Sequence, residues 1–175
     1  MPKKIKEYWS MKLGRKPKDP LTIHVMGKLS DIMLGKPIPG KYRDLGNPIL
    51  IIQINGVDIP NGLVDLGETI NDLTFVTKIT LGMKNLKPTP TILELAYWST
   101  IRPVGKLEDI TILVDSWQYH VNILVLNTQS PTGGHPLILG RPWLATTDSY
   151  IGCRSGNMVI SNKEITKNLF HYPPT

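Results

Sequence analysis

Leu63-Val64-Asp65-Leu66-Gly67-Glu68-Thr69 is the stretch that decides the fold, together with Pro136-Leu137-Ile138-Leu139-Gly140-Arg141-Pro142 about seventy residues later. The first stretch places a carboxylate at the tip of an apolar strand, on a tight glycine turn. The second is an apolar strand that ends in Gly-Arg and leads into a helical turn, with Pro142 compatible with the first helical position. The sequence therefore predicts a carboxylate presented from a rigid strand.

An Asp-x-Gly triplet is weak support by itself, because about one is expected by chance in a chain of this length. This chain has two, Asp44-Leu45-Gly46 and Asp65-Leu66-Gly67. Asp44 lies between Lys41-Tyr42-Arg43 and Asn47-Pro48, which is typical of a polar turn. Only Asp65 follows a predicted strand, and it precedes Thr69 and Asn71, whose side chains can hydrogen-bond nearby backbone.

Composition excludes several classes of protein. With 175 residues and 41% apolar content, the chain can bury a core. Its single cysteine, Cys153, excludes an internal disulfide, and no Cys/His cluster has metal-ligand spacing, so we expect no metal and no cofactor. The charged N-terminus has no apolar signal core, and no apolar run approaches a membrane span. We expect a soluble, intracellular, cytoplasmic protein without membrane contact.

The positive charge is concentrated at the N-terminus. Residues 1–19 hold seven Lys or Arg residues against Glu7 and Asp19, a net charge of +5 out of +6 for the whole chain. Such an arm can attract nucleic acid through its phosphates. The alternative is a solvated tail or a linker from a longer polyprotein, because only Tyr8 and Trp9 are available to stack on bases.

Turn residues and apolar periodicity divide the chain into four segments. They are a basic flexible arm at 1–20, a helical segment and connector at 21–47, a β-rich domain at 48–161 and a C-terminal tail at 162–175. Short helices are expected at 72–82, with Leu73, Val76 and Ile79 on one face, and at 141–147. Cys153 is expected as a small core residue. Strands are expected at 49–54, 57–64, 91–96, 110–114, 119–126, 137–139, 150–153 and 158–160, with an Asn55-Gly56 hairpin turn.

Four blocks in order carry a family resemblance. They are Pro-x-x-Tyr-x-Asp-x-Gly leading into the 49–64 hairpin; Val64-Asp65-Leu66-Gly67-Glu68-Thr69-Ile70-Asn71; Leu93-Glu94-Leu95-Ala96 with Pro103-x-Gly105-x-x-Glu108-Asp109-Ile110; and Val125-Leu126-Asn127 with 136–146. Over residues 36–160 the chain resembles the aspartic protease domain of plant Ty3/gypsy-type retrotransposon polyproteins, a relative of retropepsin. The last block is the most specific.

The resemblance implies an all-β, retropepsin-like closed barrel subunit with one or two short helices. It further implies an aspartic endopeptidase that processes a polyprotein as a homodimer, with Asp65 of each subunit as the catalytic residue and a peptide as substrate. The other implied site residues fall into three groups: an active-site loop of Leu66, Gly67, Glu68 and Thr69; a loop support of Ile138, Leu139, Gly140 and Arg141; and a flap of Tyr97, Trp98, Ser99 and Thr100.

Two positions depart from the family pattern. Leu66 replaces the Thr or Ser whose hydroxyl bonds across the dimer in active relatives, and Glu68 replaces a small residue and adds a second carboxylate. The alternative function is therefore a catalytically degenerate module of the same fold that dimerises or binds peptides. A third class, a nucleic-acid-associated fragment, depends only on the basic arm.

Overall fold

The computed structural model describes residues 40–95, 99–128 and 134–170. The chain divides into two compact units, Met1–Lys41 and Tyr42–Thr175, and nearly all described residues belong to the second. The arm expected at 1–20 and positions 21–39 of the helical segment and connector expected at 21–47 lie outside the described residues.

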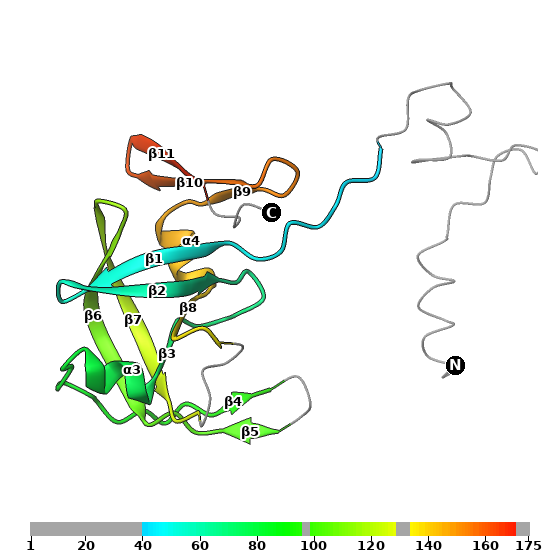
Figure 1. Ribbon diagram of the computed structural model, residues 1–175. Helices are drawn as coiled ribbons and strands as arrows, with labels where there is room; N and C mark the ends of the chain where they lie inside the picture. The colour runs from blue at the N-terminus through cyan, green and yellow to red at the C-terminus, as the bar shows by residue number, and fades with distance from the viewer. Residues whose placement is uncertain (1–39, 96–98, 129–133, 171–175) are drawn as a thin grey trace, which may run out of the picture. The chain divides into compact units, whose positions relative to one another are not determined.

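Six strands form a closed barrel in the order β1, β2, β8, β3, β7, β6 (Figure 1). A three-stranded sheet and a two-stranded sheet complete the β structure, and the described residues hold two six-residue helices. The prediction of an all-β closed barrel with one or two short helices is confirmed. The elements are β1 (Ile49–Ile54), β2 (Val57–Val64), β3 (Asp72–Thr74), α3 (Phe75–Thr80), β4 (Leu93–Glu94), β5 (Thr100–Ile101), β6 (Gly105–Val114), β7 (Trp117–Leu126), β8 (Leu137–Leu139), α4 (Arg141–Thr146), β9 (Tyr150–Gly152), β10 (Asn157–Asn162) and β11 (Ile165–Phe170).

The β1–β2 hairpin delivers the chain to Asp65. Asn55 and Gly56 both have positive φ, 52° and 77°, which is the backbone of the tight turn predicted from this dipeptide. Along β1, Leu50, Ile52 and Ile54 are buried, whereas Ile51, between Leu50 and Ile52, is exposed, so one face of the strand turns into the barrel.

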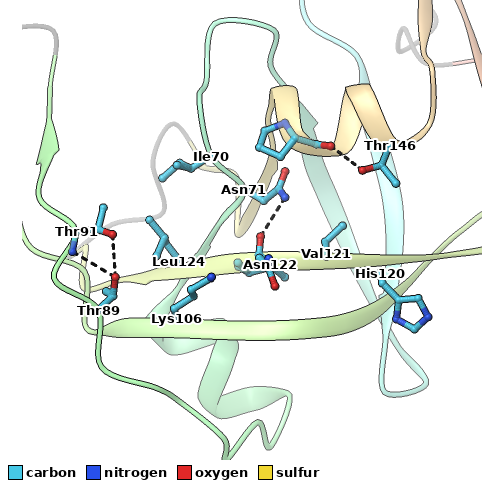
Figure 2. Close-up of a pocket in the computed structure, with 12 residues that line it drawn as sticks. Ile70, Asn71, Thr89, Thr91, Lys106, His120, Val121, Asn122, Leu124 and Thr146 are labelled. Carbon is cyan, nitrogen blue, oxygen red and sulfur yellow. Dashed lines mark hydrogen bonds between the residues drawn. The ribbon is translucent and has the colours of Figure 1, made fainter.

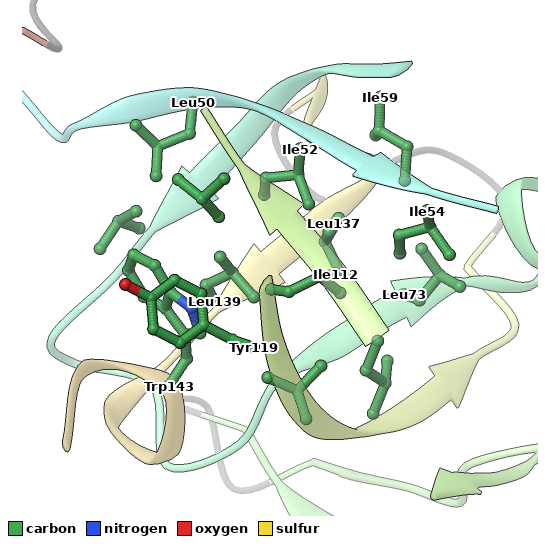
Figure 3. Packing of buried hydrophobic residues seen from close by; sticks show 14 of the residues in the cluster. Leu50, Ile52, Ile54, Ile59, Leu73, Ile112, Tyr119, Leu137, Leu139 and Trp143 are labelled. Atoms are coloured by element: carbon green, nitrogen blue, oxygen red, sulfur yellow. The ribbon is translucent and has the colours of Figure 1, made fainter. Parts of the chain in front are cut away.

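The barrel core is a single apolar cluster built from alternate strand residues (Figure 3). Leu73 of β3 and both Leu137 and Leu139 of β8 are fully buried in it. Trp143 of α4 is also fully buried, and its ring meets the Tyr119 ring edge-on at a centroid distance of 6.2 Å. The helix that follows β8 is thereby anchored in the core.

Strand β8 is short but lies between two strands of the barrel. It runs parallel to β2, pairing Val64 with Leu139, and antiparallel to β3, pairing Asp72 with Ile138. The end of β2, the start of β3 and the end of β8 therefore meet in one place, and they carry the segments singled out in the sequence.

The helix expected at 72–82 is wrong in its start and in its apolar face. Residues Asp72–Thr74 form β3, because their main chain pairs with both β7 and β8. The helix begins only at Phe75, after Thr74 Oγ1 accepts a hydrogen bond from the Thr77 N–H. Val76 and Ile79 are exposed, so the periodicity that suggested a buried stripe does not reach the core.

Three further expectations differ from the structure. Cys153 is an exposed residue after β9 and is not in the core, because the strand ends at Gly152. The segment expected as a tail from residue 162 contains β11, which pairs along its length with β10 and buries Leu169. The strand expected at 91–96 is reduced to β4, whereas the one expected at 110–114 extends back to Gly105.

Candidate active site

Asp65 is the first residue beyond β2 and is held by both main-chain and side-chain hydrogen bonds. Its N–H donates to the Leu139 carbonyl at 3.0 Å, so it continues the β2–β8 pairing. Its Oδ1 accepts a hydrogen bond from the Gly67 N–H at 2.8 Å, and its carbonyl accepts one from the Glu68 N–H at 3.3 Å. The half-buried carboxylate is therefore fixed on a turn, while Oδ2 has no partner among the described residues.

The end of β8 supports this turn through the main chain. A Cβ added to Gly140 would lie 2.1 Å from the Ile70 carbonyl oxygen and 2.8 Å from that of Glu68, so only glycine fits there. The next residue, Arg141, donates its N–H to the Glu68 carbonyl at 3.0 Å. The main chains of Leu139, Gly140 and Arg141 thus contact the Asp65 loop, Ile138 precedes them on β8, and the Arg141 side chain is exposed.

Asn71 ties the loop to two other parts of the barrel. It is 3% exposed, its Oδ1 accepts a hydrogen bond from the Gly140 N–H at 3.0 Å, and its Nδ2 donates to the Asn122 carbonyl at 3.1 Å. Figure 2 shows the Asn71 amide directed at the Asn122 main chain. The sequence indicated that Asn71 bonds backbone, but the partners lie far along the chain and could not be predicted from local turn chemistry.

The remaining loop residues face outward to different degrees. Leu66 is 66% exposed and presents an apolar side chain next to Asp65. Glu68 is half-buried and Thr69 is exposed, and both line a pocket beside the loop.

This pocket, which we call the loop pocket, has a volume of about 410 Å³. The Asp65 loop, β3, β4, β7 and β8 contribute to its wall. Its lining residues are Gly67, Glu68, Thr69, Ile70, Asp72, Ile92, Leu93, Glu94, Leu95, Leu126 and Ile138.

Asp72 is the residue of this pocket that the sequence interpretation missed. It is only 5% exposed, and burial raises the pKa of its carboxyl group to about 7, with repulsion from Glu68 as the smaller cause. Because position 72 was expected to lie in a helix, Asp72 was not identified as a site residue. In the strand, neighbouring Leu73 turns into the core, so Asp72 turns to the opposite face.

The predicted flap is only partly described. β4 and β5 pair antiparallel, Leu93 with Ile101 and Glu94 with Thr100, and the Leu95 N–H donates to the Ser99 carbonyl at 2.8 Å. Ser99 and Thr100 are exposed on this arm, whereas Tyr97 and Trp98 lie outside the described residues.

A second pocket, of about 420 Å³, lies between Ile70 and Asn71, strands β6 and β7, and α4 (Figure 2). Among its described lining residues the ionisable ones are Lys106 and His120, and none is a carboxylate. It therefore lacks the groups needed for two-carboxylate chemistry, and the loop pocket is the one associated with Asp65.

The described part of the chain lacks two other features, a metal-binding cluster and a membrane-spanning helix. In residues 40–95, 99–128 and 134–170 no group of three or more His, Cys, Asp or Glu residues is arranged to hold a metal ion. Across the same residues, no helix is long and apolar enough to cross a membrane.

Comparison with known proteins supports the architecture. No protein-family model matches the chain, and no curated protein matches it. Among solved structures, the chain is similar to the crystal structure of the retroviral protease-like domain of Ddi1 from Leishmania major, with a TM-score of 0.56 and 17% identity. The match covers 73% of this chain and 94% of that domain. The closed six-stranded barrel, with this likeness, gives the chain the retropepsin-like fold.

Proposed function

We propose that this protein is an aspartic endopeptidase that acts as a homodimer, with one Asp65 from each subunit at the catalytic centre. The observation that carries the proposal is the support of Asp65. Its main chain is bonded to Leu139, its Oδ1 is bonded to the Gly67 N–H, and Gly140 packs against the loop without room for a side chain. A catalytic carboxylate needs this kind of fixed position, because misplacement of a reacting group is costly in rate.

The chemistry requires two carboxylates at close range. Two such groups cannot both ionise easily, so the pair shares one proton, and its titration belongs to the pair. The ionised carboxylate takes a proton from a water molecule, whose oxygen attacks the peptide carbonyl carbon. The protonated carboxylate donates its proton to the carbonyl oxygen, which gives a tetrahedral carbon with two hydroxyl groups. The carboxylate that took the proton of water then passes it to the amide nitrogen, the C–N bond breaks, and the other carboxylate recovers a proton from one hydroxyl group. Because Asp65 is the one aspartate on a strand-supported Asp-x-Gly turn in this chain, the second carboxylate comes from a second copy.

We assign the substrate class and the setting from the sequence resemblance. The Pro136-Leu137-Ile138-Leu139-Gly140-Arg141-Pro142 block and the three blocks before it favour a domain that processes the polyprotein of a retroelement, inside the cell and in the cytoplasm. The β4–β5 arm would close over a bound peptide and exclude water.

Cleavage of a peptide library across pH 4–7 tests the proposal. Wild-type protein should cleave best at the acidic end, because one carboxylate of the pair must be protonated. Asp65→Asn should abolish cleavage while far-ultraviolet circular dichroism shows the same fold. Cleavage that persists in Asp65→Asn would refute the mechanism.

A catalytically degenerate module that dimerises or binds peptides is the second candidate. Leu66 favours it, because this 66% exposed side chain has no hydroxyl to bond across a dimer beside Asp65. If wild type and Leu66→Thr are both confirmed dimers and neither cleaves any peptide, this second function replaces the first.

A further inference from the structure

We propose that the loop pocket binds a positively charged side chain, Lys or Arg, of the substrate peptide, and that Asp72 is the residue that selects it. The inference rests on the proposed function for its ligand, a peptide, and adds the chemical class of one residue in that peptide. It assigns a role to a carboxylate that the two-aspartate chemistry does not use.

The wall of the loop pocket carries acidic side chains, and its described residues include no basic ones. Glu68, Asp72 and Glu94 line it, and none of its described lining residues is Lys, Arg or His. Three carboxylates around one cavity create a negative potential, which favours a cation inside. Because the described residues show no cluster arranged for a metal ion, an organic cation is the better match.

The described residues of the pocket offer no partner to the carboxylate of Asp72. Asp72 is 5% exposed, and among the described residues no hydrogen bond or ion pair joins its carboxylate, whose oxygens are not among the fully enclosed polar atoms and so open on the pocket. A carboxylate so far removed from water is costly to ionise without a donor, and a cationic side chain in the pocket would supply that donor.

The strand geometry directs Asp72 into the cavity. Asp72 pairs with Ile138 across β3–β8, while their neighbours Leu73, Leu137 and Leu139 belong to the core. Side chains alternate across a sheet, so Asp72 and Ile138 share the face that looks into the pocket.

The remaining lining suits the stem of a long basic side chain. Leu126 and Ile138 contribute apolar surface from β7 and β8, and Ile92 and Leu93 contribute it around the start of β4. Lys and Arg bury their methylene stems along such surface and hold the charge at its end. At the end of that path the cation would meet Asp72, with Glu68 and Glu94 nearby.

Proton binding gives the site a measurable signature. The titratable groups around Asp72 are Glu68 on the loop and Glu94 on β4, while the lining residues from β7 and β8 are apolar. The pKa of Asp72 is raised to about 7 by burial and by Glu68, so the empty pocket gains negative charge as the pH rises through neutrality. The preference of the pocket for a cationic side chain over a neutral one should therefore increase over the same pH range.

The test measures binding rather than cleavage. Fluorescent octapeptides in which each position in turn is Lys or norleucine, which keeps the stem without the charge, are titrated into Asp65→Asn protein and followed by anisotropy. At one position, Lys should bind about tenfold tighter than norleucine at pH 8, as for a hydrogen bond to a charged group. This preference should decrease as the pH falls from 8 to 5.

Adding Asp72→Asn to the same background should remove both the preference and its pH dependence, whereas the exposed Asp148→Asn should change neither. If the Asp72 variant does not fold, the pH dependence with Asp72 intact still decides. Equal binding of Lys and norleucine at every position, or a preference that does not change with pH, overturns the inference even if wild-type protein cleaves the peptides. An absence of cleavage by confirmed dimers of both wild type and Leu66→Thr, in turn, refutes the protease proposal while a lysine preference still stands.

Discussion

The two Asp-Leu-Gly triplets of this chain form the same local hydrogen bond but differ in what supports them. In each, the glycine N–H donates to Oδ1 of the aspartate two residues earlier, at 3.0 Å for Asp44 and 2.8 Å for Asp65. Asp44 is exposed, and Gly46 has open space around it. Asp65 is bonded to β8 instead, and Gly140 packs tightly against its loop. A tripeptide therefore specifies a turn, and strand pairing decides whether that turn presents a carboxylate in a fixed position.

The largest difference should appear when a methyl group is added to the glycine that packs against the Asp65 turn, Gly140, and to the glycine of the Asp44 turn, Gly46. Gly140→Ala places a Cβ 2.1 Å from a backbone oxygen, and should cost roughly 5 kcal/mol of unfolding free energy or prevent folding. Gly46→Ala meets no atom and should cost about 1–2 kcal/mol, because its φ of 85° disfavours a side chain. Urea unfolding compares the two, and equal costs would remove the claim that the Asp65 turn is specially supported.

Asp72, near the Asp65 turn, should give the molecule a pH-dependent stability. Its pKa rises from 3.8 to about 7 on folding, so the folded state binds the proton more tightly. Folding therefore carries no penalty from Asp72 below pH 4, and the penalty grows between pH 4 and 7 by about 1.4 kcal/mol for each pH unit, or up to about 4 kcal/mol.

Asp72→Asn should consequently be more stabilising, relative to wild type, at pH 8 than at pH 4. Urea unfolding at both pH values and at one protein concentration measures the difference, and a pH-independent effect of Asp72→Asn would contradict the assigned cause.

Removing the Asn71 side chain should weaken the Asp65 turn without touching it. Asn71→Ala leaves the Gly140 N–H and the Asn122 carbonyl without this partner, and should cost about 2 kcal/mol. Asn47→Ala, beside the Asp44 turn, is exposed and should stay within about 0.5 kcal/mol of wild type. A similar small cost for both asparagines would show that Asn71 does not hold the loop.

The two turns also illustrate which parts of the structure could be predicted from the sequence. The Asn55-Gly56 hairpin, the β2 strand and the β8 strand follow from local patterns, and the order of the blocks placed Gly140 near Asp65. The role of Asp72 could not be predicted, because it lies in a three-residue strand next to the helix at 75–80. The partners of that strand are far along the chain, so the local pattern indicated a helix instead. Cys153 and β11 were missed because apolar periodicity does not show where a strand ends or which strand it pairs with.

The smallest expected effect concerns the residue after each aspartate. In the proposed dimer, Leu66→Thr supplies a hydroxyl beside Asp65 that can bond to the second copy, and a neutral hydrogen bond contributes about 0.5–1.5 kcal/mol. The dimer dissociation constant should therefore fall by about two- to tenfold for one bond. Sedimentation equilibrium measures it, and Leu45→Thr in the other triplet is the matched control that should leave it unchanged.

Mixing subunits tests most directly whether two copies of Asp65 form one catalytic centre. Wild type and Asp65→Asn are combined in equal amounts at fixed total concentration, allowed to exchange, and assayed for peptide cleavage. Random exchange leaves about a quarter of the dimers with two wild-type copies, so the rate should fall to about a quarter of that of wild type alone. Mixing with Asp44→Asn should leave the rate unchanged. A fall to only about half with Asp65→Asn would mean that each chain acts by itself, and would contradict a centre shared between subunits.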